Sequence, residues 1–125
     1  MSQTKINVAI VDNDEGVLRA IERLLRASGF AVQVFPSAEK FLAAAPHPPP
    51  DCLLLDIQLG GMSGLELQQK LRETDDQTPI IFLTAHDAPD LREKAQRAGC
   101  SAYLIKPVSE SSLIEAINQA VKSHG

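Results

Sequence analysis

The chain alternates short, mainly apolar runs with longer stretches in which apolar residues recur three and four positions apart. A short apolar run bounded by polar or turn-forming residues is typical of a strand buried in a sheet, whereas the three- and four-residue spacing is typical of one helix face. The apolar runs predict five strands, at residues 6–11, 30–35, 51–57, 79–85 and 102–107.

Helix signals follow each of these runs. After the first run, apolar residues recur at helical spacing from Val17 to Leu25, and Gly29 is a natural end for that helix. The second helix is short and runs out in the proline-rich segment 46–50. The residues expected to open the five helices are Asp14, Ser37, Ser63 with Glu66 in a capping box, Asp87 ahead of Pro89, and about Ser109.

Five strands that alternate with five helices predict one fold class. Neighbouring parallel strands need crossovers, and right-handed crossovers place helices on both faces of the sheet. We therefore predict an α/β fold with a doubly wound five-stranded parallel sheet, in the flavodoxin-like order 2-1-3-4-5. The 125 residues, 44% of them apolar, suffice for one domain, which we place at residues 1–125.

Charge and composition limit the partners of the chain. The formal net charge is −4 and Lys and Arg form no run, so direct binding to nucleic acid or to an anionic membrane surface is not expected. No apolar stretch is long enough to span a bilayer, and the first residues lack the build of a signal peptide, which predicts a cytoplasmic protein. Cys52 and Cys100 fit no metal-binding or CxxC pattern and are expected to be buried free thiols.

Polar residues follow four of the five predicted strands. They are Asp12 and Asn13 after the first strand, Asp56 after the third, Thr84 after the fourth and Lys106 after the fifth. In the order 2-1-3-4-5 these strands are neighbours, and ligands of such folds bind at the carboxyl ends of the strands. The five side chains are therefore expected to converge on one pocket.

The chemistry of this predicted pocket indicates phosphoryl transfer. Two carboxylates and an amide oxygen form a hard, oxygen-rich site that suits Mg²⁺. The ammonium of Lys106 and the hydroxyl of Thr84 add a positive charge and a hydrogen-bond donor, which a transferred phosphoryl group needs. Asp56 lies in the middle of the set and is the expected nucleophile, because Asp forms acyl phosphates when a metal screens its charge.

The chain resembles the response-regulator receiver domains of two-component signalling over its whole length. The resemblance rests on Asp12, Asp56, Thr84 and the "KP" at 106–107, with "MSG" at 62–64 and Tyr103 in addition. The segment "SAEKFL" after the second strand and "AG" before the fifth make it most similar to the nitrogen-fixation type of receiver.

The resemblance implies a role for each residue of the pocket. Asp56 is the phosphoryl acceptor for a histidine kinase, and Lys106 and Thr84 contact the phosphoryl group. Mg²⁺ is surrounded by Asp12, Asn13, Asp56 and the backbone carbonyl of Gln58. The chain itself is then a phosphoacceptor signalling domain and not an enzyme that turns over a substrate.

The resemblance also implies a switch and several partners. Tyr103 turns inward together with Thr84, while Gln58 and His86 influence how fast the phosphoryl group is lost. Family members occur with a C-terminal output domain, in some cases a DNA-binding one, as part of a longer protein. Dimerisation on phosphorylation is a further expectation of the same kind.

Two positions depart from the family pattern. Asn13 stands where the family usually has a second acid, which removes a negative charge and predicts weaker binding of Mg²⁺. Gly60 stands where a proline usually stiffens the loop after the acceptor, and with Gly61 beside it this predicts a looser loop.

Two other functions fit parts of the sequence. The first is a degenerate receiver that no longer binds the metal because of Asn13 and acts as a phosphorylation-independent protein-interaction module. The presence of Asp56, Thr84 and Lys106 argues against this function. A small Mg²⁺-dependent phosphatase resembling the haloacid dehalogenase superfamily would use the Asp-x-Asp spacing at 12–14, but it would leave Asp56 without a role.

Overall fold

The computed structural model describes residues 5–46, 49–85 and 87–124 of the chain. Strands alternate with helices throughout, as the hydrophobic pattern predicts. The elements are β1 (Asn7–Val11), α1 (Glu15–Ala27), β2 (Ala31–Phe35), α2 (Ala38–Ala44), β3 (Cys52–Leu55), α3 (Gly64–Glu73), β4 (Ile80–Thr84), α4 (Pro89–Arg97), β5 (Ala102–Ile105) and α5 (Glu110–His124). Within the described ranges, no helix has the length and apolar character needed to cross a membrane.

The five strands form one parallel sheet in the order β2-β1-β3-β4-β5. This arrangement confirms the predicted doubly wound α/β fold and its flavodoxin-like strand order. The strands β1 and β3, which are separated in the sequence by β2 and α2, are direct neighbours. Their carboxyl ends therefore lie side by side, at the edge where the polar residues were predicted to gather.

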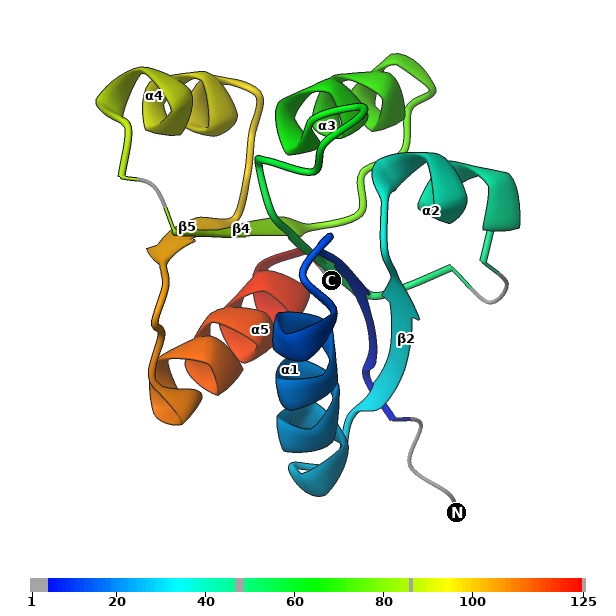
Figure 1. Cartoon of the computed structure of the whole chain (residues 1–125), viewed down its shortest axis with the longest axis vertical. Coiled ribbons are helices and arrows are strands. Elements are labelled where there is room, and N and C mark those ends of the chain that lie inside the picture. The colour runs from blue at the N-terminus through cyan, green and yellow to red at the C-terminus, as the bar shows by residue number, and fades with distance from the viewer. Residues whose placement is uncertain (1–4, 47–48, 86, 125) are drawn as a thin grey trace.

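Helices cover both faces of the sheet. Figure 1 shows α2, α3 and α4 together on one side of the strands and α1 and α5 on the other. Side chains along β1 alternate between the two layers, so that Val8 and Ile10 pack with α1 and α5 while Ala9 and Val11 pack with α2 and α3. The strands β3 and β4 are buried along their whole length. The apolar runs that predict them are explained by this burial on both faces.

Three of the predicted helix caps are confirmed. The side chains of Asp14, Ser37 and Ser63 each accept a hydrogen bond from the backbone amide three positions later, at 3.0 to 3.1 Å. Glu66 completes the predicted capping box, because its carboxylate accepts a hydrogen bond from the backbone amide of Ser63 at 3.0 Å. These contacts are local, which is why the sequence predicts them.

The prediction that Asp87 caps the fourth helix is wrong. The residue in the capping position is Ala88, which makes no side-chain hydrogen bond, and Pro89 is the first residue of α4. Asp87 lies one position too early, and its carboxylate instead contacts the guanidinium of Arg92 at 3.1 Å. Asp87 therefore pairs with a charged side chain in the first turn of α4 and not with the backbone amides at the start of the helix.

The two cysteines are free, as predicted. Cys52 is buried at the start of β3, whereas Cys100 is half-buried and so only partly matches the expectation. Burial raises the pKa of the Cys52 thiol to about 12, which keeps the thiol protonated at neutral pH. The contribution of Cys52 is therefore to packing.

Candidate functional site

Lys106 joins two carboxylates at the carboxyl edge of the sheet. Its ammonium nitrogen lies 2.7 Å from Asp12 Oδ2 and 2.9 Å from Asp56 Oδ2. Asp12 and Asp56 directly follow the paired strands β1 and β3, whose register holds their backbones side by side. Lys106 follows β5, two strands away from β3, so only a long side chain spans the end of β4 to reach them. The structure brings these three predicted residues together.

Each carboxylate is fixed in orientation by its own backbone. Asp12 Oδ1 accepts a hydrogen bond from the amide of Asp14 at 2.9 Å, and Asp56 Oδ1 accepts one from the amide of Gln58 at 3.0 Å. These are turns in which an Asp side chain contacts the amide two residues later. One oxygen of each acid is thereby tied to the loop, and the other oxygen points to Lys106.

The centre formed by Asp12, Asp56 and Lys106 is largely shielded from water. Asp12 is 3% exposed and Asp56 is 8% exposed. Burial by itself lowers the pKa of Lys106, but the hydrogen bonds and negative charges of Asp12 and Asp56 outweigh burial and raise it above the usual value of 10.5. Lys106 is therefore cationic at neutral pH. One cation facing two acidic side chains leaves the centre able to attract a further cation.

The oxygen donors near Lys106 fit a hard divalent cation such as Mg²⁺. The carboxylates of Asp12 and Asp56 have lone pairs beyond those that they use for Lys106. Asn13 follows Asp12 with an exposed side chain. Nowhere in the described ranges do three or more His, Cys, Asp or Glu side chains come together as a metal-binding group. A cation here would therefore depend on an amide, backbone carbonyls and water besides the two carboxylates.

The loop after Asp56 borders the same centre. Gln58 is exposed, and its amide is the donor to Asp56. Gly60 has a φ of +87°, in the left-handed region, and a Cβ atom there would lie 3.7 Å from Asn13 Nδ2. A proline cannot adopt this φ, so the backbone here requires a residue such as glycine. The predicted tuning residue His86 lies outside the described residues.

Thr84 and Tyr103 lie on neighbouring strands beside the carboxylates. Thr84 ends β4 and is 1% exposed, and the carbonyl of Thr84 accepts a hydrogen bond from the amide of Lys106 at 2.8 Å. Tyr103, on β5, is paired with Phe82, and the centroids of the two rings are 6.1 Å apart. The hydroxyl of Tyr103 is buried and has no hydrogen-bond partner among the described residues.

Arg92 of α4 covers the ring of Tyr103. The guanidinium carbon is 5.1 Å from the ring centroid, and the same guanidinium contacts Asp87. In the sequence Arg92 resembles any solvated helix arginine, because its contact with Tyr103 joins two elements that only the fold brings together. Burial raises the pKa of Tyr103 above its usual value, while the positive charge of Arg92 opposes this increase.

The opposing effect of Arg92 on Tyr103 leads to a titration prediction. Arg92→Gln removes the positive charge that stabilises the tyrosinate, so we expect the pKa of Tyr103 to rise further. Tyr103 is the single tyrosine and the chain has no tryptophan, so near-ultraviolet absorbance against pH reports this residue alone. Arg23→Gln, on exposed α1 surface, is the control. A pKa that stays unchanged or falls in Arg92→Gln would contradict the contact, provided that circular dichroism shows a folded protein.

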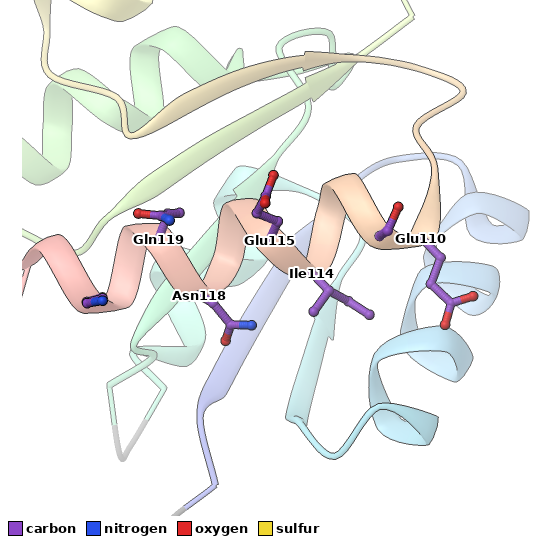
Figure 2. A pocket seen from close by; sticks show the side chains of 7 residues that line it. Glu110, Ile114, Glu115, Asn118 and Gln119 are labelled. Carbon is purple, nitrogen blue, oxygen red and sulfur yellow. The ribbon is translucent and has the colours of Figure 1, made fainter.

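A shallow hollow on the surface lies apart from these residues. It runs along the outer side of α5 and is lined by residues such as Glu110, Ile114, Asn118 and Lys122. Figure 2 shows that the labelled side chains all stand on this one helix. None of the predicted site residues lines it. The chemistry described above is thus confined to the carboxyl edge of the sheet.

Comparisons with known proteins agree on the family. The model for the response regulator receiver domain matches residues 8–118. Response regulator protein TodT of Pseudomonas putida is 38% identical over 122 residues, which are 98% of this chain and 54% of TodT. Transcriptional regulatory protein FixJ of Rhizobium meliloti is 36% identical over 117 residues, which are 94% of this chain and 57% of FixJ. The chain thus spans about half the length of the curated relatives that it matches.

A solved structure has the same fold. The crystal structure of a CheY-like response regulator receiver domain protein from Methanospirillum hungatei superposes with a TM-score of 0.89 at 27% identity, and the match covers 96% of both chains. The similarity to FixJ confirms the predicted resemblance to receivers of the nitrogen-fixation type. By its sequence and its fold, the chain belongs to the response regulator receiver domain family of two-component systems.

Proposed function

We propose that this chain is a phosphorylatable receiver in which Asp56 accepts a phosphoryl group from a histidine kinase in the presence of Mg²⁺. The observation that carries the proposal is the ammonium of Lys106, held 2.9 Å from Asp56 and 2.7 Å from Asp12. A cation against the attacking oxygen also lies where the oxygens of an incoming phosphoryl group arrive, and it can stabilise their charge. Burying three charged side chains costs desolvation energy, and apolar side chains would stabilise the core as well or better. The presence of these charges therefore favours a chemical role for them.

The side chains of the centre divide the work of phosphoryl transfer. Asp56 Oδ2 forms the bond to phosphorus as the bond to the donor nitrogen breaks, while Oδ1 keeps its hydrogen bond to Gln58. Asp12, Asn13, Asp56 and the backbone carbonyl of Gln58 are the proposed ligands of Mg²⁺. The metal would neutralise the charge that builds up between the carboxylate and the phosphoryl group.

Release of Lys106 and movement of Thr84 and Tyr103 form the proposed switch. The ammonium of Lys106 exchanges one carboxylate contact for the new phosphoryl oxygens, and the hydroxyl of Thr84 turns toward the same oxygens. Tyr103 then moves inward; its buried hydroxyl gives up no hydrogen bond among the described residues when it does so. The new contacts bias an equilibrium between two arrangements of α4 and β5. Gln58 and His86 are proposed to tune the lifetime of the phosphorylated form.

The partners follow from the family and are part of the proposal. A histidine kinase supplies the phosphoryl group, and in a longer protein an output domain, such as a DNA-binding one, follows the receiver. The relatives TodT and FixJ, about half of whose length this chain spans, support this arrangement. Residues 1–125 form the receiver domain, which is cytoplasmic and forms a homodimer when phosphorylated.

Asn13 favours a second candidate function. Because it replaces an acid, the described residues offer only two carboxylates at this centre, and no larger acidic group forms there. A receiver that fails to bind Mg²⁺ would be a phosphorylation-independent interaction module. The phosphatase alternative has no such support, since Asp14, its second acid, is occupied in capping α1.

Intact-mass analysis with acetyl phosphate and Mg²⁺ tests the proposal. We expect one added phosphoryl group on the wild-type chain, none on Asp56→Asn and none without metal, because the carboxylate and its counter-charge are both required. Asp90→Asn, a change at an exposed acid in the first turn of α4, is the control and should take up the group normally. The absence of an adduct at any Mg²⁺ concentration would instead favour the interaction module.

A further inference from the structure

The loop between β3 and α3 connects Asp56 to the rest of the molecule and contains Gln58. Both ends of this loop, residues 57–63, are fixed by hydrogen bonds to backbone amides. At the start, the amide of Gln58 donates to Asp56 Oδ1. At the end, the amide of Gly64 donates to the carbonyl of Ile57 at 2.8 Å, and Ser63 forms the capping box of α3. The loop therefore closes on itself at its base, directly beside Asp56.

The middle of the same loop is the pair Gly60 and Gly61, which lies between the buried Leu59 and the partly buried Met62. Gly60 and Gly61 have no side chains, and glycine loses more conformational freedom on folding than any other residue. Gly60 also lies next to the side chain of Asn13, since a Cβ atom at Gly60 would lie 3.7 Å from Asn13 Nδ2. A shift of this segment would therefore reach both Gln58 and Asn13. Leu59 anchors the loop on one side of the glycines, and the contacts of Met62 decide how firmly it is held on the other side.

Glu39 of α2 contacts this segment. Its carboxylate accepts a hydrogen bond from the amide of Met62 at 2.8 Å, across 23 positions of sequence. The carboxylate also rests against the bare Cα of Gly61, since a Cβ atom there would lie 2.6 Å from Glu39 Oε2. The hydrogen bond from Met62 is the main cause that lowers the pKa of Glu39, which keeps the side chain anionic at neutral pH.

The helix that carries Glu39 is itself held in place. Ser37 caps its first turn through the amide of Lys40, and Phe41 is buried with its ring 5.2 Å from that of Phe35 on β2. Glu39 therefore reaches the loop from a helix that is itself held in place, and its carboxylate fixes Met62 relative to α2.

We infer that Glu39 is a positioning residue for the metal site: by holding Met62 and Gly61, it sets the place of the Gln58 carbonyl and of Asn13 relative to Asp56. The inference rests on the proposed function, since that proposal makes Gln58 and Asn13 ligands of Mg²⁺. Metal–oxygen distances tolerate changes of only about 0.2 Å. A mobile loop would hold its ligand oxygens less accurately, and the affinity for Mg²⁺ would fall. Substitution of a residue that orients a metal ligand typically lowers the metal affinity by about 10- to 100-fold.

The test compares the wild-type chain with Glu39→Ala, Glu39→Gln and the control Glu110→Ala. Glu110 is also an exposed acid in the first turn of a helix, so its variant corrects for lost charge at a helix start. In the unphosphorylated protein, NMR measures the hydrogen exchange of the Met62 amide and the shift of the Gln58 amide during titration with MgCl₂. The rate of phosphorylation by acetyl phosphate is then measured at limiting and at saturating Mg²⁺.

We expect Glu39→Ala to speed exchange at Met62 and to weaken Mg²⁺ binding, each by on the order of tenfold. Phosphorylation should slow at limiting Mg²⁺ and recover at saturating Mg²⁺, which a general loss of structure would not produce. Glu39→Gln keeps an oxygen acceptor and should be intermediate, and Glu110→Ala should behave as the wild type.

Two results would overturn the inference. Faster exchange at Met62 with unchanged Mg²⁺ affinity would make Glu39 a support of a surface loop only, and unchanged exchange would show that it holds nothing. The proposed function is tested separately by the wild-type adduct. If the wild type takes up no phosphoryl group while Glu39→Ala still weakens Mg²⁺ binding, the phosphoacceptor proposal fails and the positioning role stands.

Discussion

Lys106→Met will lower the free energy of unfolding by about 2–4 kcal/mol. Methionine has a similar length but no charge, so the variant leaves Asp12 and Asp56 without their common cation. The two acids are only 3% and 8% exposed, and water can therefore do little to replace the ammonium. Urea denaturation of the wild type and the variant measures the difference. In the same variant, phosphorylation should also be strongly slowed.

A second substitution identifies the cause of that loss. Adding Asp56→Asn to Lys106→Met removes one of the two carboxylates that lack a cation, so we expect the double variant to be more stable than Lys106→Met alone. If the two substitutions acted independently, the double variant would instead lose the sum of the two single losses. Lys70→Met, at an exposed position of α3, is the control and should stay within about 0.5 kcal/mol of the wild type. An equally small effect of Lys106→Met would mean that the centre is solvated in solution.

The sign of the pKa shift fixes how this stability depends on pH. The pKa of Lys106 in the folded chain lies above its usual 10.5, so its contribution is fully present below that value and is lost as the pH rises through the folded value. The stability difference between the wild type and Lys106→Met should therefore stay constant across the neutral range. Under strongly alkaline conditions it should shrink, because Lys106 then loses its proton.

The sequence predicts the central trio because parallel strands impose its geometry. Asp12 and Asp56 follow adjacent strands, and the length of Lys106 suits a residue two strands away. The caps at Asp14 and Ser63 are likewise predictable, because the contacts span three positions. Such features depend on strand order and local spacing, and both can be inferred from hydrophobic and polar patterns.

Contacts between distant elements could not be predicted in this way. Arg92 reaches Tyr103 from a different element, and Glu39 reaches Met62 across 23 positions. The error at Asp87 has a local origin: α4 is capped at Ala88, one position later than predicted, and Asp87 contacts Arg92 instead. The expectation of a loose loop at Gly60 considered only the glycines and not the carboxylate that holds their neighbour. The sequence contains all of these residues but does not indicate which of them meet.

Gly64 is the position where local and tertiary reasoning differ most. It is the first residue of α3, and by helix propensity alone alanine should be better there than glycine by up to about 1 kcal/mol. In the fold, however, a Cβ atom at Gly64 would overlap the carbonyl oxygen of Asp56. It would also lie 3.0 Å from the carbonyl carbon of Asp56 and from the Cα of Ile57. All three are backbone atoms, which cannot rotate away as a side chain could.

Gly64→Ala is therefore expected to destabilise the chain by about 3 kcal/mol, because α3 must move away from the end of β3. The shift also breaks the hydrogen bond from Gly64 to Ile57 and displaces Asp56, so phosphorylation should slow as well. The matched control is Gly29→Ala, where φ is +96° but nothing lies within 4 Å of the added atom. Strain alone should cost that variant about 1 kcal/mol.

The order of the two glycine variants decides which physical effect dominates. Backbone conformation alone predicts that Gly29→Ala is the more harmful of the two, since Gly29 has a left-handed φ and Gly64 does not. Close approach to Asp56 predicts the reverse. If urea denaturation finds Gly64→Ala the less stable of the two, the glycine of "MSG" is needed for the space between α3 and the proposed acceptor. If Gly64→Ala is as stable as the wild type, α3 can shift freely, and the position of Asp56 would then depend on β1, the Gln58 amide and Lys106 rather than on α3.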